Sequence, residues 1–226
     1  MTDIPPYIVP IGCYENNESK FCGTGFIVGD YLITAYHVIR KALFSGAFAV
    51  INNNQFNICA SNQRNKYTSN LKDKDHFDVA IISLRGRDLC NPNKNDEDFI
   101  VDSPLKLSIE VPQKGLQVST KFFQGTFPEL TLFEETENEV CDFPFTSLPE
   151  SLYQRWDTSF TIRHSGRITH GSSGSPVLIG NKVIGIITNG LDKQNLEKYN
   201  LPLDYLYYCE CLRVDVLKSQ FPELFG

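Results

Sequence analysis

The sequence has no long hydrophobic run and no leader-like N-terminus. Its first residues, MTDIPPYIVPIG, carry no basic cluster, and Pro5 and Pro6 interrupt them early. A signal peptide needs a basic segment followed by an apolar one, and a spanning helix needs about 20 mostly apolar residues. We therefore expect neither a signal peptide nor a spanning helix, and we expect a cytoplasmic location.

Basic residues are also scarce. Lys and Arg number 21 against 27 Asp and Glu, which gives a formal net charge of -6 at pH 7. Binding to nucleic acid or to an anionic membrane surface usually depends on a basic patch. The charge balance thus disfavours nucleic acid and membranes as partners.

The cysteines lack the pairing of a disulfide framework. Such frameworks usually show even numbers of regularly spaced cysteines. No C-x-x-C is present to form a zinc site, and the nearest approach to one is a single C-x-C. We expect reduced, mostly buried cysteines, no metal site and no cofactor. The seven cysteines are Cys13, Cys22, Cys59, Cys90, Cys141, Cys209 and Cys211.

What the sequence does contain is a succession of short segments rich in Val, Ile, Tyr, Phe and Thr, without internal repeats or low-complexity tracts. Segments of this kind, separated by turn-forming residues, are typical of antiparallel strands joined as hairpins, so we predict an all-β protein. The expected strands are 7–13, 24–28, 31–36, 46–51, 55–60, 79–84, 105–111, 117–123, 129–134, 158–163, 176–179, 183–188 and 205–212. The expected turns include 29–30, 52–54, 165–166, 180–181 and 189–190.

Helical patterns are few. One weak pattern, HVIRKALF, begins at His37, and a second covers 215–221, where Asp215 is a candidate N-cap and Pro222 a stop. The polar, turn-rich stretch 86–104 divides the strands into two sets, and we place an interdomain linker there. A chain of 226 residues with 41% hydrophobic content can form one long β domain or two small ones.

Three short motifs carry residues suited to catalysis. In GTGFIVGDYLITAYHVI, His37 follows a predicted strand. In HFDVAIISL, Asp78 opens a predicted buried strand, where a carboxylate needs a hydrogen-bonding partner such as a histidine Nδ1–H. Taken alone, His37 could be a surface or core histidine and Asp78 a turn cap. His76 is expected to face solvent.

The third motif, ITHGSSGSP, contains Ser173 between two glycines of a tight loop. A serine nucleophile needs a base and two backbone N–H groups directed at the oxyanion, and Gly171 permits the loop conformation that this requires. Alone, the motif could be a Gly/Ser turn. An α/β-hydrolase elbow is excluded because position 175 is Ser and because the order is His37, Asp78, Ser173.

The order His, Asp and then Gly-x-Ser-Gly at strand ends is that of the chymotrypsin-type triad. At these positions the sequence resembles the trypsin-like (chymotrypsin-fold) serine proteases. ITAYHVI is similar to the T-A-x-H motif of that family, DVAII to its D-[IV]-A motif, and GSSGSPV with KVIGIIT to its G-x-S-G-x-P motif and following strand. The SGSPV and VIGI segments are most similar to those of the bacterial HtrA-like and glutamyl-endopeptidase-like branches. YYCECLRVDVLKSQF is similar to the last strand and helix of the family.

The resemblance implies a fold of two six-stranded antiparallel β-barrels with a short C-terminal helix. Residues 1–100 would form the barrel that carries His37 and Asp78, and residues 101–226 the barrel that carries Ser173. Ser173 would attack the scissile carbonyl, His37 would act as the base, and Asp78 would hold the His37 tautomer. The N–H groups of Gly171 and Ser173 would form the oxyanion hole.

The resemblance also implies a substrate pocket. Its base would lie at Arg167, so cleavage after Lys or Arg should be poor. Arg167 could point inward and favour an acidic P1 residue, or outward and leave an apolar pocket beside Ile168. The Glu210 carboxylate could pair with Arg167 and neutralise its charge, or it could reverse the expected disfavour of a basic P1 residue. The expected pocket residues are Arg167, Ile168, His170, Thr188, Asn189 and Gly190.

Some family features are missing. Glutamyl-specific relatives carry a histidine where this chain has Ile187, and no IVGG-type start is present for activation by a new N-terminus. We predict a cytosolic serine endopeptidase that acts on a protein or peptide substrate. The alternatives are a catalytically silent binding module and the protease effector domain of a regulated stress or defence system with a regulatory protein partner.

Overall fold

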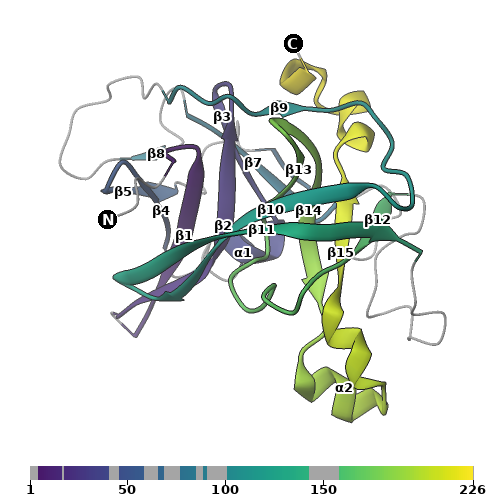
Figure 1. The fold of residues 1–226 in the computed structure, drawn as a ribbon. Coiled ribbons are helices and arrows are strands. Elements are labelled where there is room, and N and C mark those ends of the chain that lie inside the picture. Colours follow the sequence, from purple (N-terminus) through teal and green to yellow (C-terminus); the bar gives the residue numbers. More distant parts are fainter. Residues whose placement is uncertain are drawn as a thin grey trace.

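The structure, a computed structural model, describes residues 5–16, 18–40, 46–58, 66–68, 77–84, 89–90, 101–142 and 158–225. Strands dominate these ranges, and they assemble into two sheets (Figure 1). No helix within these ranges is long and apolar enough to span a membrane.

The C-terminal sheet closes into a six-stranded antiparallel barrel. The strands follow one another in the order β13, β10, β11, β12, β15 and β14, and β13 pairs with β14 to close the circle. The short β9 adds to β14 in parallel. The strands are β9 (Lys106–Leu107), β10 (Gln117–Thr126), β11 (Glu129–Cys141), β12 (Ser159–Arg163), β13 (Pro176–Ile179), β14 (Lys182–Gly190) and β15 (Tyr208–Arg213).

The N-terminal sheet forms a half-barrel in the order β6, β7, β3, β2, β1, β4, β5 and β8. A closed barrel with a half-barrel sheet confirms the predicted chymotrypsin-like, all-β fold. The strands are β1 (Ile8–Glu15), β2 (Glu18–Val28), β3 (Tyr31–Thr34), β4 (Ala47–Ile51), β5 (Asn54–Ile58), β6 (Lys66–Thr68), β7 (Val79–Ser83) and β8 (Leu89–Cys90).

Three apolar clusters hold the sheets together. One fills the N-terminal sheet around Ile11 and Ile82, and another fills the barrel around Phe122 and Ile184. The third contains Phe26 of β2 and Leu212 of β15, together with further side chains from both sheets. Burial of large apolar side chains is the main favourable term in folding, so this third cluster fixes the sheets against each other.

The hairpin turns follow the sequence pattern at most positions. β4 and β5 join through Asn52 and Asn53, whose φ values of 50° and 60° are tolerated best by Asn and Gly. Gly29-Asp30 connects β2 to β3, and Gly180-Asn181 connects β13 to β14. The turn expected at 189–190 is wrong, because both residues extend β14 and pair with β15.

The helices are short. α1 (Tyr36–Arg40) begins one residue before the predicted HVIRKALF segment and overlaps it, and η3 (Asp215–Ser219) is the predicted C-terminal helix in 3-10 form. The sequence did not predict α2 (Lys193–Tyr199), η2 (Leu203–Tyr207) or η4 (Pro222–Phe225). Most of the predicted linker 86–104 lies outside the described residues, as does His76.

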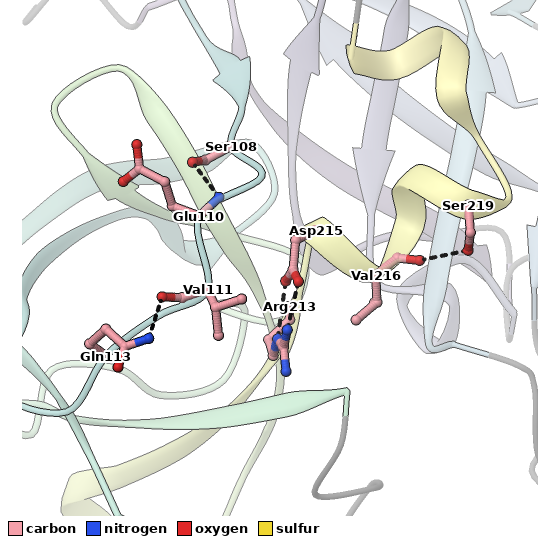
Figure 2. A network of polar contacts seen from close by, with 8 residues as sticks. All are labelled: Ser108, Glu110, Val111, Gln113, Arg213, Asp215, Val216 and Ser219. Carbon is pink, nitrogen blue, oxygen red and sulfur yellow. Dashed lines mark hydrogen bonds and ion pairs between the residues drawn. The ribbon is translucent and has the colours of Figure 1, made fainter.

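A local ion pair follows the end of β15. The Arg213 Nη2 and Nε atoms donate to the two carboxylate oxygens of Asp215 at 2.6 and 3.0 Å (Figure 2). Glu110 N donates to Ser108 Oγ at 3.1 Å in the 108–113 segment that follows β9. Both contacts are local, because they join residues two positions apart.

Candidate active site

His37 and Asp78 meet because of the strand register. Thr34 of β3 pairs with Ala80 of β7 in antiparallel fashion, so the residues after β3 lie beside those before β7. The Asp78 carboxylate accepts from His37 Nδ1 at 2.6 Å and from His37 N at 2.9 Å. A carboxylate that holds Nδ1–H leaves Nε2 as the acceptor of the ring. The His37 side chain is 45% exposed and that of Asp78 16% exposed.

The Ser173 loop packs directly on β2 and β3. Gly174 has a φ of +85°, and a Cβ atom at this position would lie 2.1 Å from Thr24 O and 2.2 Å from Thr34 Oγ1. Only glycine fits such a backbone angle and such a close approach. Gly23 is similarly confined, because a Cβ atom there would lie within 3 Å of both Ser173 O and the Val38 side chain. The structure therefore brings Ser173 to the strand ends that carry His37.

Some backbone amides of the 171–175 loop donate hydrogen bonds within the protein, and others do not. Ser172 N donates to Thr169 O, Gly174 N to Ile187 O, and Ser175 N to Ser172 O. Within the described part of the chain, the N–H groups of Gly171 and Ser173 donate to no acceptor, and the Ser173 hydroxyl has no hydrogen bond. Catalytic hydrogen bonds are often formed only with substrate bound, so unpaired donors of this kind are available to an oxyanion.

The expected pocket residues differ in burial. Arg167, His170 and Gly190 are exposed and Asn189 is half-buried. Ile168 packs into the barrel core, and Thr188 is buried with its hydroxyl directed to Glu210 O at 3.3 Å. Glu210 is itself buried, and it pairs with Asn189 across β14 and β15. The exposure of Arg167 is what the outward orientation predicts.

Two buried polar residues and the half-buried Gln124 hold the 164–169 loop, in roles that no sequence motif indicates. Glu135 Oε1 accepts from Ser165 N at 2.8 Å and from the Ser165 hydroxyl. His164 Nδ1 accepts from Gly166 N at 3.1 Å, and burial lowers the pKa of His164 to about 4. Gln124 Nε2 donates to Arg167 O at 2.6 Å and to Thr169 Oγ1 at 2.7 Å. No motif marked Glu135, His164 or Gln124, because their partners lie far away or in an irregular loop.

Five cysteines form no disulfide: Cys13, Cys22, Cys141, Cys209 and Cys211. Cys13 and Cys22 lie with their sulfurs 2.7 Å apart on β1 and β2. Burial raises the pKa of Cys141 to about 11 and that of Cys211 well above its ordinary value. In the ranges that the structure covers, no three His, Cys, Asp or Glu side chains gather in a way that could hold a metal ion.

Comparisons with known proteins address the family and the fold of the chain. A profile of the trypsin-like peptidase domain matches residues 23–186. A search of curated protein sequences finds no significant match.

Among solved structures, the active form of the Rv3671c protease from M. tuberculosis is similar, with a TM-score of 0.59 and 19% identity over 97% of this chain and 81% of that chain. The scabies mite inactivated protease paralogue S-I1 has a TM-score of 0.61 and 16% identity, and the match covers 96% of this chain and 93% of that one. Mouse neuropsin, a serine protease, has a TM-score of 0.59 and 16% identity over 99% and 97% of the two chains.

At these identities the structural likeness establishes the fold alone. The profile, by contrast, spans well over half of the sequence and includes all three motifs identified from the residues. The chain therefore belongs to the trypsin-like peptidase family.

Proposed function

We propose that this protein is a serine endopeptidase with a His37–Asp78–Ser173 triad. Ser173 Oγ attacks the scissile carbonyl while His37 Nε2 accepts its proton, and the protonated imidazole then gives that proton to the leaving amine. Asp78 holds the tautomer and stabilises the imidazolium. The N–H groups of Gly171 and Ser173 bind the oxyanion of the tetrahedral intermediate. Water then hydrolyses the acyl-enzyme.

One observation carries this proposal. The Asp78 carboxylate uses both oxygens to hold His37, beside a loop in which only the Gly171 and Ser173 amides are left without acceptors. A base with a fixed tautomer, a serine and two available donors are the groups that acyl transfer requires.

We further propose two domains. Residues 1–100 supply His37 and Asp78, and residues 101–226 supply Ser173 and the substrate pocket. The pocket residues are Arg167, Ile168, His170, Thr188, Asn189 and Gly190. The exposed Arg167 places a positive charge at the rim, which repels a basic P1 side chain, and a small or medium apolar P1 residue is favoured.

We further propose a protein substrate inside the cell, since the free cysteines are typical of a reducing compartment. Similarity to an inactivated paralogue keeps a silent binding module as the second candidate. The two candidates differ in one chemical property, which is the reactivity of Ser173.

Labelling with a fluorophosphonate probe tests the proposal. Ser173 should react, and Ser173→Ala and His37→Ala should each lower kcat by about 10⁴- to 10⁶-fold, with little further loss in the double variant because triad members act as a unit. Ser219→Ala is a matched control, since this exposed serine bonds only Val216 O in its own helix. An unlabelled but folded protein would support the binding module.

A peptide library scanned at P1 tests the pocket. We expect poor cleavage after Lys and Arg, and Arg167→Ala should raise the rate at these basic P1 residues while leaving apolar P1 residues little changed, because the variant removes the positive charge at the rim. Dominant cleavage after Lys or Arg would instead implicate the buried Glu210 carboxylate as the recognition group. Comparing protein N-termini in cells with active and Ser173→Ala enzyme would then identify the substrate.

A further inference from the structure

Thr24 of β2 connects four segments of the protein. It is fully buried. Its N–H donates to Ser173 O at 3.0 Å, and its hydroxyl donates to Gly171 O at 2.9 Å. The same hydroxyl accepts from Phe123 N of β10 at 3.0 Å, and its carbonyl accepts from Thr34 Oγ1 of β3 at 2.7 Å. One side chain and its own peptide groups thus tie the Ser173 loop to both sheets.

The two carbonyls that Thr24 holds belong to Gly171 and Ser173, the residues whose own N–H groups have no acceptor among the described residues. Peptide groups are planar and rigid, so fixing the carbonyls of 171 and 173 constrains the peptide between them. That intervening peptide carries the Ser173 N–H. The direction of this donor therefore depends on the two bonds from Thr24.

The hydroxyl of Thr24 is chemically necessary for this arrangement. It donates and accepts at once, and among small side chains only Ser and Thr do both. Valine has nearly the same shape but would leave Phe123 N–H and Gly171 C=O without their partner. Phe123 is itself buried, so its amide could not turn to water instead.

We propose that Thr24 is a positioning residue for the oxyanion hole, an inference that rests on the proposed peptidase function. Thr24 does not touch the substrate. It orients the 172–173 peptide, which carries the Ser173 N–H, and through Thr34 it holds the loop in register with the strand that leads to His37.

Steady-state kinetics of Thr24→Val and Thr24→Ser test the proposal. Loss of one oxyanion donor usually costs about 10²- to 10³-fold in kcat, so misdirecting a donor in Thr24→Val should cost about 10- to 100-fold with KM nearly unchanged. Thr24→Ser should restore most of the rate, because it keeps the hydroxyl. The pH at which the rate rises should not move, since the His37–Asp78 contact does not involve Thr24.

Thr161→Val is the matched control. Thr161 is as buried as Thr24, but its hydroxyl has no hydrogen-bond partner among the described residues. Its replacement should leave kcat unchanged. Equal kcat losses in Thr24→Val and Thr161→Val would overturn the proposal, as would a Thr24→Val enzyme with wild-type kcat.

Amide hydrogen exchange separates this inference from the peptidase function. Thr24→Val should speed exchange across 171–175 relative to wild type and Thr24→Ser, whether or not the protein cleaves peptides. If Ser173→Ala kept full activity, the triad would be wrong. If Ser173→Ala were inactive and Thr24→Val changed neither exchange nor kcat, only the role of Thr24 would be wrong.

Discussion

At the scale of single residues, the contact between Asp78 and His37 has a directional requirement. Asp78 accepts two hydrogen bonds from His37, one from Nδ1 and one from the backbone N–H. An asparagine offers only one acceptor oxygen, and its amide nitrogen is a donor. The ring would then be free to place its proton on Nε2, where it cannot act as the base.

We therefore expect Asp78→Asn to lower kcat by roughly 10⁴-fold while the fold is retained. Peptide hydrolysis measured beside circular dichroism checks this. An undiminished rate in Asp78→Asn would show that another carboxylate orients His37, and Asp73 and Asp75, which lie outside the described residues, would then be replaced in turn.

His164 gives a pH dependence of stability. Burial depresses its pKa from 6.5 to about 4, so the folded protein keeps this imidazole neutral where the unfolded chain already binds a proton. Nearby Glu135 opposes the shift but does not cancel it. The folded state therefore loses stability as the pH falls from about 6.5 to 4, by about 3 kcal/mol in total from this group.

His164→Asn isolates that contribution. Asparagine can still accept from Gly166 N through its side-chain oxygen, but it does not titrate. Urea unfolding between pH 4 and 7 should show a shallower loss of stability in the variant than in wild type, with near-equal values above pH 7. Parallel pH curves would mean that His164 is protonated in the folded protein.

Sequence motifs made His37, Asp78 and Ser173 candidates, because each lies in a short segment with recognisable neighbours. Thr24 and Glu135 escaped notice because their roles depend on partners distant in sequence. Thr24 and Gly171 are 147 positions apart, and Glu135 and Ser165 are 30 apart. Such pairs meet only through the strand register and the closure of the barrel. The residues next to each partner in the sequence therefore give no sign of the contact.

At the scale of elements, the β10–β11 hairpin connects the barrel to the N-terminal sheet. Phe127 lies at the tip of this hairpin. Its ring centroid is 5.2 Å from that of Phe48 on β4 and 6.1 Å from that of Phe21 on β2. Phe21 in turn lies against Gly171, where a Cβ atom would be 2.3 Å from its ring. The hairpin tip thus supports the strand on which the 171–175 loop rests.

We expect Phe127→Ala to lower the free energy of unfolding by about 1–3 kcal/mol, less than the 3–5 kcal/mol typical of a fully buried Phe, because Phe127 is half-buried. Activity should fall as well, since Phe21 loses its support. Thermal unfolding and peptide hydrolysis measure the two effects.

Phe133→Ala is the control for the hairpin. Phe133 is also half-buried and stacks on Phe122 at 6.0 Å, but this contact lies within the barrel. Its loss should cost similar stability and leave activity unchanged. A Phe127→Ala variant that is destabilised but fully active would remove any link from the hairpin tip to the site.

Elements with simple periodicity were predictable, and those with mixed polarity were not. The predicted strand 129–134 extends to Cys141, through an acidic stretch in which Glu135 and Asn138 are nonetheless buried. α2 has a single buried residue, Leu196, so no apolar periodicity marks it, and only its Asp192 N-cap could have signalled its start. In both elements tertiary contacts outweigh local composition.

At the scale of the whole molecule, the proposed site draws its parts from two sheets. His37 and Asp78 come from the N-terminal sheet and Ser173 from the barrel, and the shared apolar cluster around Phe26 and Leu212 keeps these sheets in place. The site geometry therefore depends on packing across the whole protein and not on any one loop.

No disulfide supports that packing at Cys13, Cys22, Cys141, Cys209 or Cys211. Dithiothreitol should therefore leave both the rate of peptide hydrolysis and the melting temperature unchanged. A loss of either on reduction would show that a disulfide maintains the active fold, and the cytoplasmic location proposed for this protein would then be wrong.

Mild oxidation should act at one place first. The Cys13 and Cys22 sulfurs lie 2.7 Å apart, near the S–S bond length of about 2.05 Å, whereas burial keeps the Cys141 and Cys211 thiols protonated at neutral pH. Oxidised glutathione should convert this pair to a disulfide, with two thiols of glutathione released and two hydrogens lost from the protein. Intact mass and peptide mapping detect the bond, and Cys22→Ser should abolish it.

Because Cys22 lies between Phe21 and Gly23, which touch the Ser173 loop, the rate measured before and after oxidation shows how far the site tolerates movement of β2. A first bond that involved Cys141 or Cys211 instead would contradict the burial argument.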